Sequence, residues 1–415
     1  MNRLRPVTVY LMMQAAASLL FSMVFTVMTV YRVESVHLNE FQLVLIGTVL
    51  ELSYFLFEIP TGVLADTYSR RLSVVLGFIL IGAGYVLEGL IPLFMAGLLA
   101  QVIAGLGYGF SSGASEAWIS DEIGQENVGT VFMRGTQVGL AAGIVGIMTG
   151  SLLASLRLNL PIVLGSASLI ILGVLLAFVM TEHGFQPAPR NERTRLQSMR
   201  DTFRAGIREI RVKPILVTLM GITLLYGAFT EGFDRLWQAH FLKNFEFPNL
   251  LAPVIWFGVM GVVAQLLGLA VTEITRRRID SGHPLITARI LGLINVVMIV
   301  SIVLFGLAGN FAVAVIAYWT ITLTRTIRGP LYTTWLTQNI ESKVRATVIS
   351  MSEQADSIGQ IVGGPVIGAI ATWFSLRAVM VLAGIILAPG ILLYRRAVGY
   401  GSVDMPRVET NASEG

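Results

Sequence analysis

Several ionisable side chains lie inside long apolar stretches of this 415-residue sequence. An ionised group at the centre of a bilayer is unfavourable by about 2.5–3.5 kcal/mol on insertion scales, so each one requires an explanation. Glu51 lies near the middle of such a stretch, with no basic residue close to it along the chain. A desolvated carboxyl favours its protonated form, which is what a proton carrier requires. Glu51 is therefore a candidate for proton or cation handling, and the alternative is a carboxyl hydrogen-bonded to a neighbouring helix.

Two pairs of charges stand at helical spacing in neighbouring apolar stretches. Arg325 and Arg328 are three residues apart, as are Glu353 and Asp356, so each pair lies on one face of a helix. Mutual ion pairing is one solution. The other is a substrate or proton site, with Asp356 as a proton-coupling candidate and Glu353 as part of a gate.

Two further groups of charges occupy other stretches. The first comprises Glu116, Asp121 and Arg134. We interpret it as a network on the inner side that changes with conformation, in which Glu116 is also a proton-coupling candidate. The second comprises Glu231, Asp234 and Arg235. It lies near the outer end of its stretch and is either an outer gate or a local ion-pair anchor.

Polar and aromatic side chains inside the same stretches are candidates for the lining of a cavity. A pocket for an amphiphilic ligand is mainly apolar, with a few polar groups. The candidates are Gln14, Phe25, Gln101, Tyr108 and Tyr226, together with Arg325 and Arg328. The alternative is that most of the Met and Phe side chains face lipid or other helices.

The sequence excludes several kinds of chemistry. It has no Cys, which rules out a disulfide framework, a thiolate metal site and a Cys nucleophile, and its four His are scattered. No G-x-x-x-x-G-K-[ST] motif is present. A net charge of +4 is too small to indicate a nucleic-acid partner. We therefore expect no enzymatic activity, no cofactor, no metal and no nucleic-acid partner.

The composition is that of a membrane protein. Hydrophobic residues make up 54% of the chain and charged residues only 13%, against about 25% charged in soluble proteins. A spanning helix requires about 20 mainly apolar residues. Twelve stretches meet this requirement: 7–31, 42–64, 72–91, 94–118, 129–154, 160–180, 215–237, 250–272, 284–305, 311–335, 345–372 and 375–395. The sequence thus predicts an all-α membrane protein with twelve transmembrane helices.

Lys and Arg are concentrated in the connections that lie on the side of the N-terminus if the helices alternate in direction. The positive-inside rule then makes both termini cytoplasmic. The longest connection, 182–214, is Arg-rich, and its apolar residues fall at helical spacing over 191–213. It is either an amphipathic helix on the inner leaflet or a linker that only obeys the positive-inside rule. The predicted units are a bundle over 1–181, this linker, a bundle over 215–396 and a tail over 397–415.

The chain also repeats at a shift of 217 residues. Residues 107–150 align without gaps with 324–367, so that Trp118 meets Trp335 and Gly146 meets Gly363. The matched segments are six helices apart. We therefore expect two six-helix halves related by an axis along the membrane normal.

The most specific motif is Gly62-Val-Leu-Ala-Asp66-Thr-Tyr-Ser-Arg70-Arg71, between the second and third stretches. Gly62 allows close helix contact and Asp66 can accept hydrogen bonds at a helix end. The pattern G-x-L-A-D-x-x-x-R-R resembles the loop 2–3 signature of the major facilitator superfamily. That resemblance implies a fold of two six-helix bundles and a conformational latch formed by Gly62, Asp66, Arg70 and Arg71.

Within that superfamily the sequence resembles drug–proton antiporters of the macrolide and tetracycline efflux type. The resemblance rests on the segments 57–66, 112–122 and 231–237. Two positions depart from the pattern: Gln101 replaces the usual Arg of helix 4, and the Gly139–Gly143 run of helix 5 lacks its Pro. The resemblance implies a monomeric proton-coupled exporter of amphiphilic drugs in the cell membrane, surrounded by lipid. The alternative is a facilitator of the same fold for a small anionic metabolite or a lipid.

Overall fold

The protein is all-helical throughout the residues that the structure describes. The structure is a computed structural model, and it describes residues 5–187, 204–278, 284–340 and 344–403. The principal helices are α1 (Pro6–Glu34), α2 (Glu40–Thr67), α3 (Arg70–Leu90), α4 (Phe94–Ser111), α5 (Ala114–Ile123), α6 (Gln125–Leu156), α7 (Leu160–Val179), α9 (Pro214–Asn244), α10 (Pro253–Arg278), α11 (Pro284–Leu307), α12 (Phe311–Gln338), α13 (Arg345–Trp373), α14 (Leu376–Ile386) and α15 (Ala388–Val403).

Ten helical segments of the described chain are long and apolar enough to cross a bilayer. Two of these segments each combine two helices, α4 with α5 and α14 with α15. The helices α12 and α13 are 28 and 29 residues long but are not among the ten. The chain is therefore a multi-pass all-α membrane protein, which confirms the predicted class.

One predicted stretch is divided where a glycine permits it. The stretch 94–118 ends as α4 at Ser111 and continues as α5 after Gly113, whose φ is +66°. Glycine adopts this left-handed conformation readily because it has no Cβ. The break separates α5 from α4, so Glu116 and Asp121 lie on a separate short helix.

Local sequence explains why the connections are short. Asn39 and Gln42 form a reciprocal capping box at the start of α2, and Ser69 accepts a hydrogen bond from the Leu72 N–H at the start of α3. Asn310 caps α12 in the same way. These caps satisfy backbone N–H groups that would otherwise be unpaired, so each helix can begin within a few residues of the previous one.

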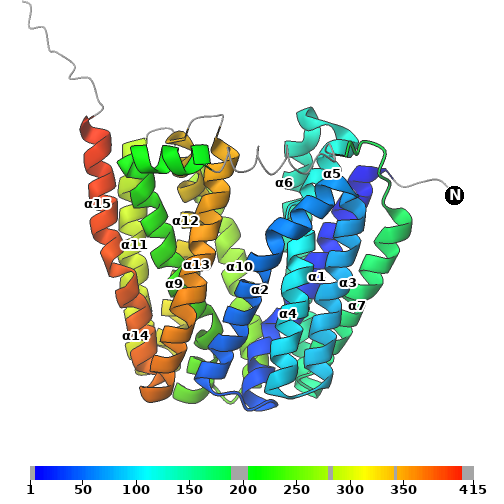
Figure 1. Ribbon diagram of the computed structural model, residues 1–415. Helices are drawn as coiled ribbons and strands as arrows, with labels where there is room; N and C mark the ends of the chain where they lie inside the picture. The colour runs from blue at the N-terminus through cyan, green and yellow to red at the C-terminus, as the bar shows by residue number, and fades with distance from the viewer. Residues whose placement is uncertain (1–4, 188–203, 279–283, 341–343, 404–415) are drawn as a thin grey trace, which may run out of the picture.

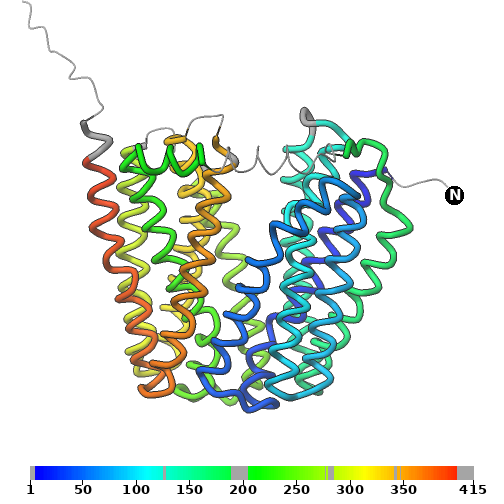
Figure 2. The backbone as a smooth tube through the Cα atoms, in the orientation of Figure 1, coloured from blue at the N-terminus to red at the C-terminus, as the bar shows by residue number. Residues whose placement is uncertain are grey.

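The helices form two sets that meet at one end (Figures 1 and 2). We call α1–α7 the N-terminal set and α9–α15 the C-terminal set. Helix α1 begins and α15 ends at the same end of the molecule, here called the termini end, and the other end is called the distal end (Figure 1). Between the sets, α2 packs along α13 and α6 packs along α10. Toward the termini end the ribbons of α2 and α13 diverge (Figure 2).

The apolar core reflects this arrangement. One buried cluster joins the two sets, because Val44 of α2 packs in the same cluster as Phe233 of α9 and Ile367 of α13. These three residues lie toward the distal end. A cluster around Trp118 belongs mainly to the N-terminal set, and a cluster around Trp335 belongs to the C-terminal set alone. Among the described residues, apolar packing therefore joins the sets at the distal end.

Corresponding glycines of the sequence repeat make corresponding contacts. A Cβ on Gly146 of α6 would overlap the backbone of Leu19 on α1. A Cβ on Gly363 of α13 would overlap the backbone of Ala228 on α9. Gly146 and Gly363 are the positions that the shift of 217 residues aligns. In each set, small residues thus let this helix approach the first helix closely.

The described part of the long connection is helical over 204–212. A Cβ on Gly206 would meet Thr347 and Met351 of α13, and Ile210 packs against the core cluster around Trp335. The end of the connection therefore packs against the C-terminal set. Residues 191–203 of the predicted amphipathic segment 191–213 lie outside the described residues.

Candidate functional site

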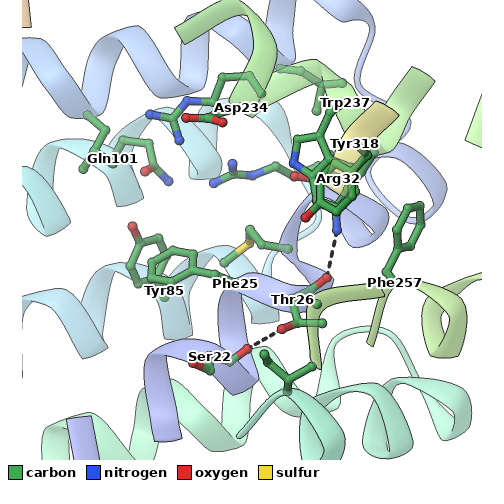
Figure 3. Close-up of a pocket in the computed structure, with 18 residues that line it drawn as sticks. Ser22, Phe25, Thr26, Arg32, Tyr85, Gln101, Asp234, Trp237, Phe257 and Tyr318 are labelled. Carbon is green, nitrogen blue, oxygen red and sulfur yellow. Dashed lines mark hydrogen bonds between the residues drawn. The ribbon is translucent and has the colours of Figure 1, made fainter. Parts of the chain in front are cut away.

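A cavity of about 420 Å³ lies between the two helix sets, in the distal half of the molecule. Its walls come from α1, α2, α3, α4 and α6 on one side and from α9, α10 and α12 on the other. Its lining is aromatic, polar and charged, and includes Phe25, Thr26, Thr29, Arg32, Tyr85, Gln101, Asp234, Arg235, Trp237, Gln238, Phe257 and Tyr318. Figure 3 shows most of these side chains around the open space. Both sets contribute, so the cavity changes if the sets move relative to one another.

The wall from the N-terminal set contains a buried ion pair. Arg32 Nε and Nη2 donate to Glu88 Oε1 and Oε2 over 2.6 and 3.0 Å. Gln101 Nε2 donates to Glu88 Oε2 over 2.8 Å. The three residues are 5%, 3% and 1% exposed. One acid is matched by one base, and both carboxylate oxygens have donors, so this network is closed.

The opposite wall contains a shared arginine. Arg235 of α9 lies 3.3 Å from Glu231 Oε2 on its own helix and 3.6 Å from Glu51 Oε1 on α2. Glu231 is only 1% exposed. The pair with Glu51 joins the two helix sets. Two carboxyl groups therefore share one guanidinium, unlike Glu88, which has Arg32 to itself.

A third ion pair adjoins the second. Arg325 Nη1 and Nη2 donate to Asp234 Oδ1 and Oδ2 over 2.5 and 2.7 Å, and its Nε donates to Tyr226 Oη over 3.2 Å. The structure thus pairs Arg325 with α9. The alternative considered from the sequence, pairing with Glu353 or Asp356, is not what the structure shows.

The second arginine of α12 has a different environment. The guanidinium carbon of Arg328 lies 3.6 Å from the ring centroid of Tyr226 and 4.9 Å from that of Tyr332. Its Nη2 has no hydrogen-bond partner among the described residues. Asp356 accepts a hydrogen bond from Gln360 on its own helix over 2.8 Å, and Glu353 is exposed. The arginines of α12 are therefore not directly bonded to the acids Glu353 and Asp356 of α13.

Aromatic rings form much of the remaining wall. Phe25 and Tyr85 meet edge to face at 5.2 Å between centroids. Across the cavity, Trp237 stacks on Tyr318 at 4.3 Å and meets Phe257 edge to face at 5.5 Å. Flat aromatic faces beside ionic groups suit a ligand with apolar and charged parts.

A second cavity of about 340 Å³ lies beside Glu51, between α2 and α4. It is lined by Leu50, Glu51, Tyr54, Tyr108, Ser111 and Ser112. Leu50 also lines the central cavity. Of these two cavities, Glu51 lines the second, and its partner Arg235 lines the central one.

Several contacts join the helix sets at the distal end. Lys243 Nζ of α9 lies 2.7 Å from Glu40 Oε1 of α2. Gln238 Nε2 donates to the Thr26 carbonyl over 3.0 Å (Figure 3). Nearer the termini end, Gln354 Nε2 of α13 donates to Glu58 Oε2 of α2 over 2.6 Å. Helix α9 thus binds α1 and α2 directly.

Asp66, Arg70 and Arg71 of the loop motif contact residues of the N-terminal set. Arg70 Nη1 lies 2.6 Å from Asp121 Oδ2 and donates to the Ala117 carbonyl over 2.8 Å. Asp66 lies 3.9 Å from Arg70, and Arg71 donates to the Ala177 carbonyl. These contacts bind the α2–α3 loop to α5 and α7.

The predicted reason for a glycine at position 62 is wrong for this conformation. A Cβ built on Gly62 meets no atom within 4 Å. Since Leu64 and Tyr68 nearby are exposed, this turn of α2 faces outward at the termini end. Close helix contact therefore does not require Gly62 here.

The remaining predicted residues lie away from the cavity. Gln14 donates to Tyr10 Oη over 3.0 Å within α1. Glu116 is exposed and accepts a hydrogen bond from Ser115 over 2.7 Å. Arg134 is exposed at the termini end of α6. Of the predicted cavity residues, Phe25 and Gln101 line the central cavity and Tyr108 lines the second one.

Sequence reasoning missed the Arg32–Glu88 pair and the aromatic wall. Glu88 was a detectable signal, because it is an acid inside the apolar stretch 72–91. Arg32 lies near the distal end of α1 and Glu88 near the distal end of α3, so both residues lie at a similar depth in the membrane. Tyr85, Trp237 and Tyr318 carried no signal, since aromatic residues occur on every face of these helices. Among the described residues, no group of three His, Cys, Asp or Glu could hold a metal ion.

Comparisons with known proteins agree with this fold. The chain is 24% identical over 360 residues to YxaM of Bacillus subtilis, an uncharacterized MFS-type transporter, and the match covers 85% of this chain and 86% of YxaM. Among solved structures, a bacterial homologue of the human lysosomal transporter Spinster in its inward-facing, unoccupied conformation superposes with a TM-score of 0.72 at 16% identity. That match covers 97% of this chain and 98% of the homologue.

The nucleoside transporter NupG superposes with a TM-score of 0.76 at 14% identity, over 94% of this chain and 99% of NupG. A POT peptide transporter in complex with sulfate superposes with a TM-score of 0.74 at 12% identity, over 96% of this chain and 94% of that transporter. These likenesses show the fold. The model of the Major Facilitator Superfamily matches residues 10–353. The chain is a membrane transporter of the Major Facilitator Superfamily.

Proposed function

We propose that the protein is a proton-coupled secondary transporter that exports amphiphilic drugs by alternating access. In this proposal the chain crosses the cell membrane twelve times, with α4 and α5 forming one span, α14 and α15 another, and α12 and α13 one each. The bundles are 1–181 and 215–396, joined by the linker 182–214 and followed by the tail 397–415. Both termini are cytoplasmic, which makes the termini end the inner side, and the protein works as a monomer.

The distal contacts support an inward-facing state. Lys243–Glu40 and Gln238–Thr26 close the distal end, and the apolar cluster around Phe233 joins the helix sets there. Helices α2 and α13 diverge toward the termini end (Figure 1). Alternating access then requires these distal contacts to break while the termini end closes. The contacts of Asp66, Arg70 and Arg71 lie at that end and would be remade against the other bundle.

The main support for proton coupling is the balance of charges among the ion pairs beside the central cavity. The ion pairs beside the cavity join three arginines to four acids: Arg32, Arg235 and Arg325 to Glu51, Glu88, Glu231 and Asp234. Glu88 and Asp234 each have their own arginine, so Glu51 and Glu231 share Arg235. Holding the buried Glu231 and the partly exposed Glu51 ionised together is unfavourable, because a single guanidinium then compensates two negative charges. We therefore assign the exchangeable proton to the Glu51–Glu231 pair.

The same balance favours a cationic substrate. A cation bound beside Arg235 and Asp234 takes the place of the proton, and the rings of Phe25, Tyr85 and Trp237 can accept its apolar parts. Proton and substrate then compete for one site, as an antiporter requires. The other candidate solutes, a small anionic metabolite or a lipid, would rely on Arg325 and Arg328. Asp234 already neutralises Arg325, so we keep the cationic drug as the proposal.

Proteoliposomes with an imposed pH gradient test this function. The probes are tetracycline, a macrolide and a lipophilic cationic dye, each with the wild-type chain and the variant Glu51→Gln. We expect gradient-driven movement of at least one probe, reduced at least tenfold in Glu51→Gln. Glu116→Gln is the matched control, because Glu116 is an exposed acid away from the cavity. Full gradient-driven transport in Glu51→Gln would refute the assignment of the proton, and no movement of any probe by folded protein would refute drug export.

A further inference from the structure

A third concave surface lies on the outside of the C-terminal set. It is a groove of about 330 Å³ between α11 and α15, lined by Ala288, Arg289, Gly292, Leu293, Val296, Ile391, Tyr394, Arg395 and Val398. None of these residues lines the central cavity or the cavity beside Glu51. The groove is therefore independent of the site described above.

The surroundings of the groove face lipid. On α11, Leu293 is 65% exposed, and the exposed apolar surface continues along the helix to Val300 and Leu304. On α15, Leu392 is 61% exposed. In a multi-pass membrane protein, such continuous exposed apolar surface is covered by acyl chains. The groove thus opens to the bilayer.

The charge of the groove is entirely positive. Arg289 and Arg395 are its charged lining residues, and both are exposed. Neither forms an ion pair with any residue in the described ranges. Arg289 lies five residues after the start of α11, and Arg395 lies eight residues before the end of α15. At 1.5 Å per residue these are depths of roughly 8 and 12 Å from the termini end.

The shallower of these depths is close to the boundary between headgroups and acyl chains, and the long side chain of the deeper arginine can reach that boundary. The hydrocarbon core is about 30 Å thick, and the headgroup regions bring the total to about 40–45 Å. Arginine matches the geometry of phosphate because its guanidinium donates two parallel hydrogen bonds. Basic pockets between transmembrane helices on the cytoplasmic side are suited to anionic lipid headgroups. The apolar floor at Gly292 and Val296 continues from the two arginines along the helices.

We propose that the groove between α11 and α15 binds one anionic phospholipid. Its phosphate lies between Arg289 and Arg395, and one acyl chain lies over Gly292, Leu293 and Val296. The placement in the inner leaflet rests on the proposed cytoplasmic side of the termini end. The binding of the lipid itself does not depend on the transported substrate or on protons.

Native mass spectrometry of the purified full chain tests the site. The probes are dioleoylphosphatidylglycerol and, as the uncharged comparison, dioleoylphosphatidylcholine. Each surface arginine contributes about 1 kcal/mol to the binding of anionic lipid, so Arg289→Gln with Arg395→Gln should weaken phosphatidylglycerol binding about 30-fold. Phosphatidylcholine binding should not change.

Arg396→Gln is the matched control, because Arg396 is exposed on the same helix but does not line the groove. We expect it to leave phosphatidylglycerol binding within twofold of wild type. Gly292→Leu keeps both charges but fills the groove, and it should also weaken binding. Equal losses in Arg396→Gln and the double variant, or no loss in the double variant, would overturn the proposal. Displacement of the lipid by glycerol 1-phosphate at equal concentration would also overturn it, because the acyl chain would then contribute nothing.

Discussion

The carboxyl groups beside the two walls of the central cavity differ in how they are paired. On the wall of the N-terminal set, Glu88 receives two hydrogen bonds from Arg32 and one from Gln101. On the opposite wall, Arg235 is shared at 3.3 Å by Glu231 of its own helix and at 3.6 Å by Glu51 of α2 in the N-terminal set. The first arrangement lies within one helix set, and the second joins both. The Arg32–Glu88 pair has no unpaired charge, so it stabilises one arrangement of its helices. Sharing of Arg235 between two acids leaves one carboxyl that can exchange a proton.

This difference explains how similar residues can have separate roles. Removing one partner of a closed buried pair leaves an uncompensated charge. Removing one acid of a shared group leaves the remaining acid and base balanced. Mutations on the two walls should therefore affect different properties, stability on one side and coupling on the other.

The largest effect is expected for Glu88→Ala, which leaves Arg32 buried without a counter-ion. Loss of one partner of a buried pair destabilises by about 3–5 kcal/mol. Thermal unfolding of the purified protein in detergent should show a clearly lower midpoint. The double variant Arg32→Met with Glu88→Leu removes both charges and should recover most of that loss. A double variant as unstable as Glu88→Ala would show that the ion pair itself is not the stabilising feature.

The next effect concerns the shared arginine and the variant Glu231→Gln. With Glu231 neutral, three acids match three arginines within these ion pairs, so no carboxyl of the set has a proton to exchange. In the wild type, binding of a cationic dye should strengthen at least tenfold from pH 6 to pH 8, because the bound proton leaves. In Glu231→Gln that pH dependence should disappear while the thermal midpoint changes little. Equilibrium dye binding at pH 6 and pH 8 measures this pH dependence in both proteins. An unchanged pH dependence in Glu231→Gln would show that the exchangeable proton is not on the Glu51–Glu231 pair.

A smaller effect is expected at the distal contact between the sets. Lys243 and Glu40 are 41% and 18% exposed in their side chains, and such surface pairs contribute about 0–1 kcal/mol. Lys243→Gln should therefore shift the population toward distal opening by at most about fivefold. The chain has no Cys, so a single Cys at Thr29 in the cavity can report the shift. Its labelling by a membrane-impermeant thiol reagent from the distal side should accelerate, and slower labelling would contradict a gate at this pair.

The smallest effect is expected for Glu116→Gln. Glu116 is exposed on α5, and its carboxylate accepts a hydrogen bond from its neighbour Ser115. Exposed substitutions usually change stability by less than about 0.5 kcal/mol. Gradient-driven transport should stay within twofold of wild type. A large loss would show that the inner side of the N-terminal set also carries the coupled proton.

Much of the architecture could be predicted from the sequence. Continuous apolar stretches dictate helices in a bilayer, because every backbone polar group must be satisfied within its own segment. Asn39, Ser69 and Asn310 mark where helices begin, and Gly113 marks a break that the apolar pattern alone did not reveal. The repeat that aligns Gly146 with Gly363 was also readable, and both glycines do pack against the first helix of their set.

The candidate site was only partly predictable. Glu51, Gln101 and Arg235 were selected because polar groups inside apolar stretches are unfavourable without a partner. Their partners were not predictable, since Arg235 is 184 positions from Glu51 and the periodicity of one helix says nothing of which helix faces it. The same reasoning paired Arg325 with α13, its neighbour in sequence, whereas the structure pairs it with Asp234 on α9.

The sequence by itself determined that this chain is helical, that it lies in a membrane, that it is internally repeated and which of its charges lie within apolar stretches. These properties follow from local composition and spacing. Only the tertiary structure decided that Arg32 belongs to Glu88 alone, while Glu51 and Glu231 share Arg235. The physical reason is that an ion pair depends on distances of a few ångströms between helices, which are set by how whole helices pack.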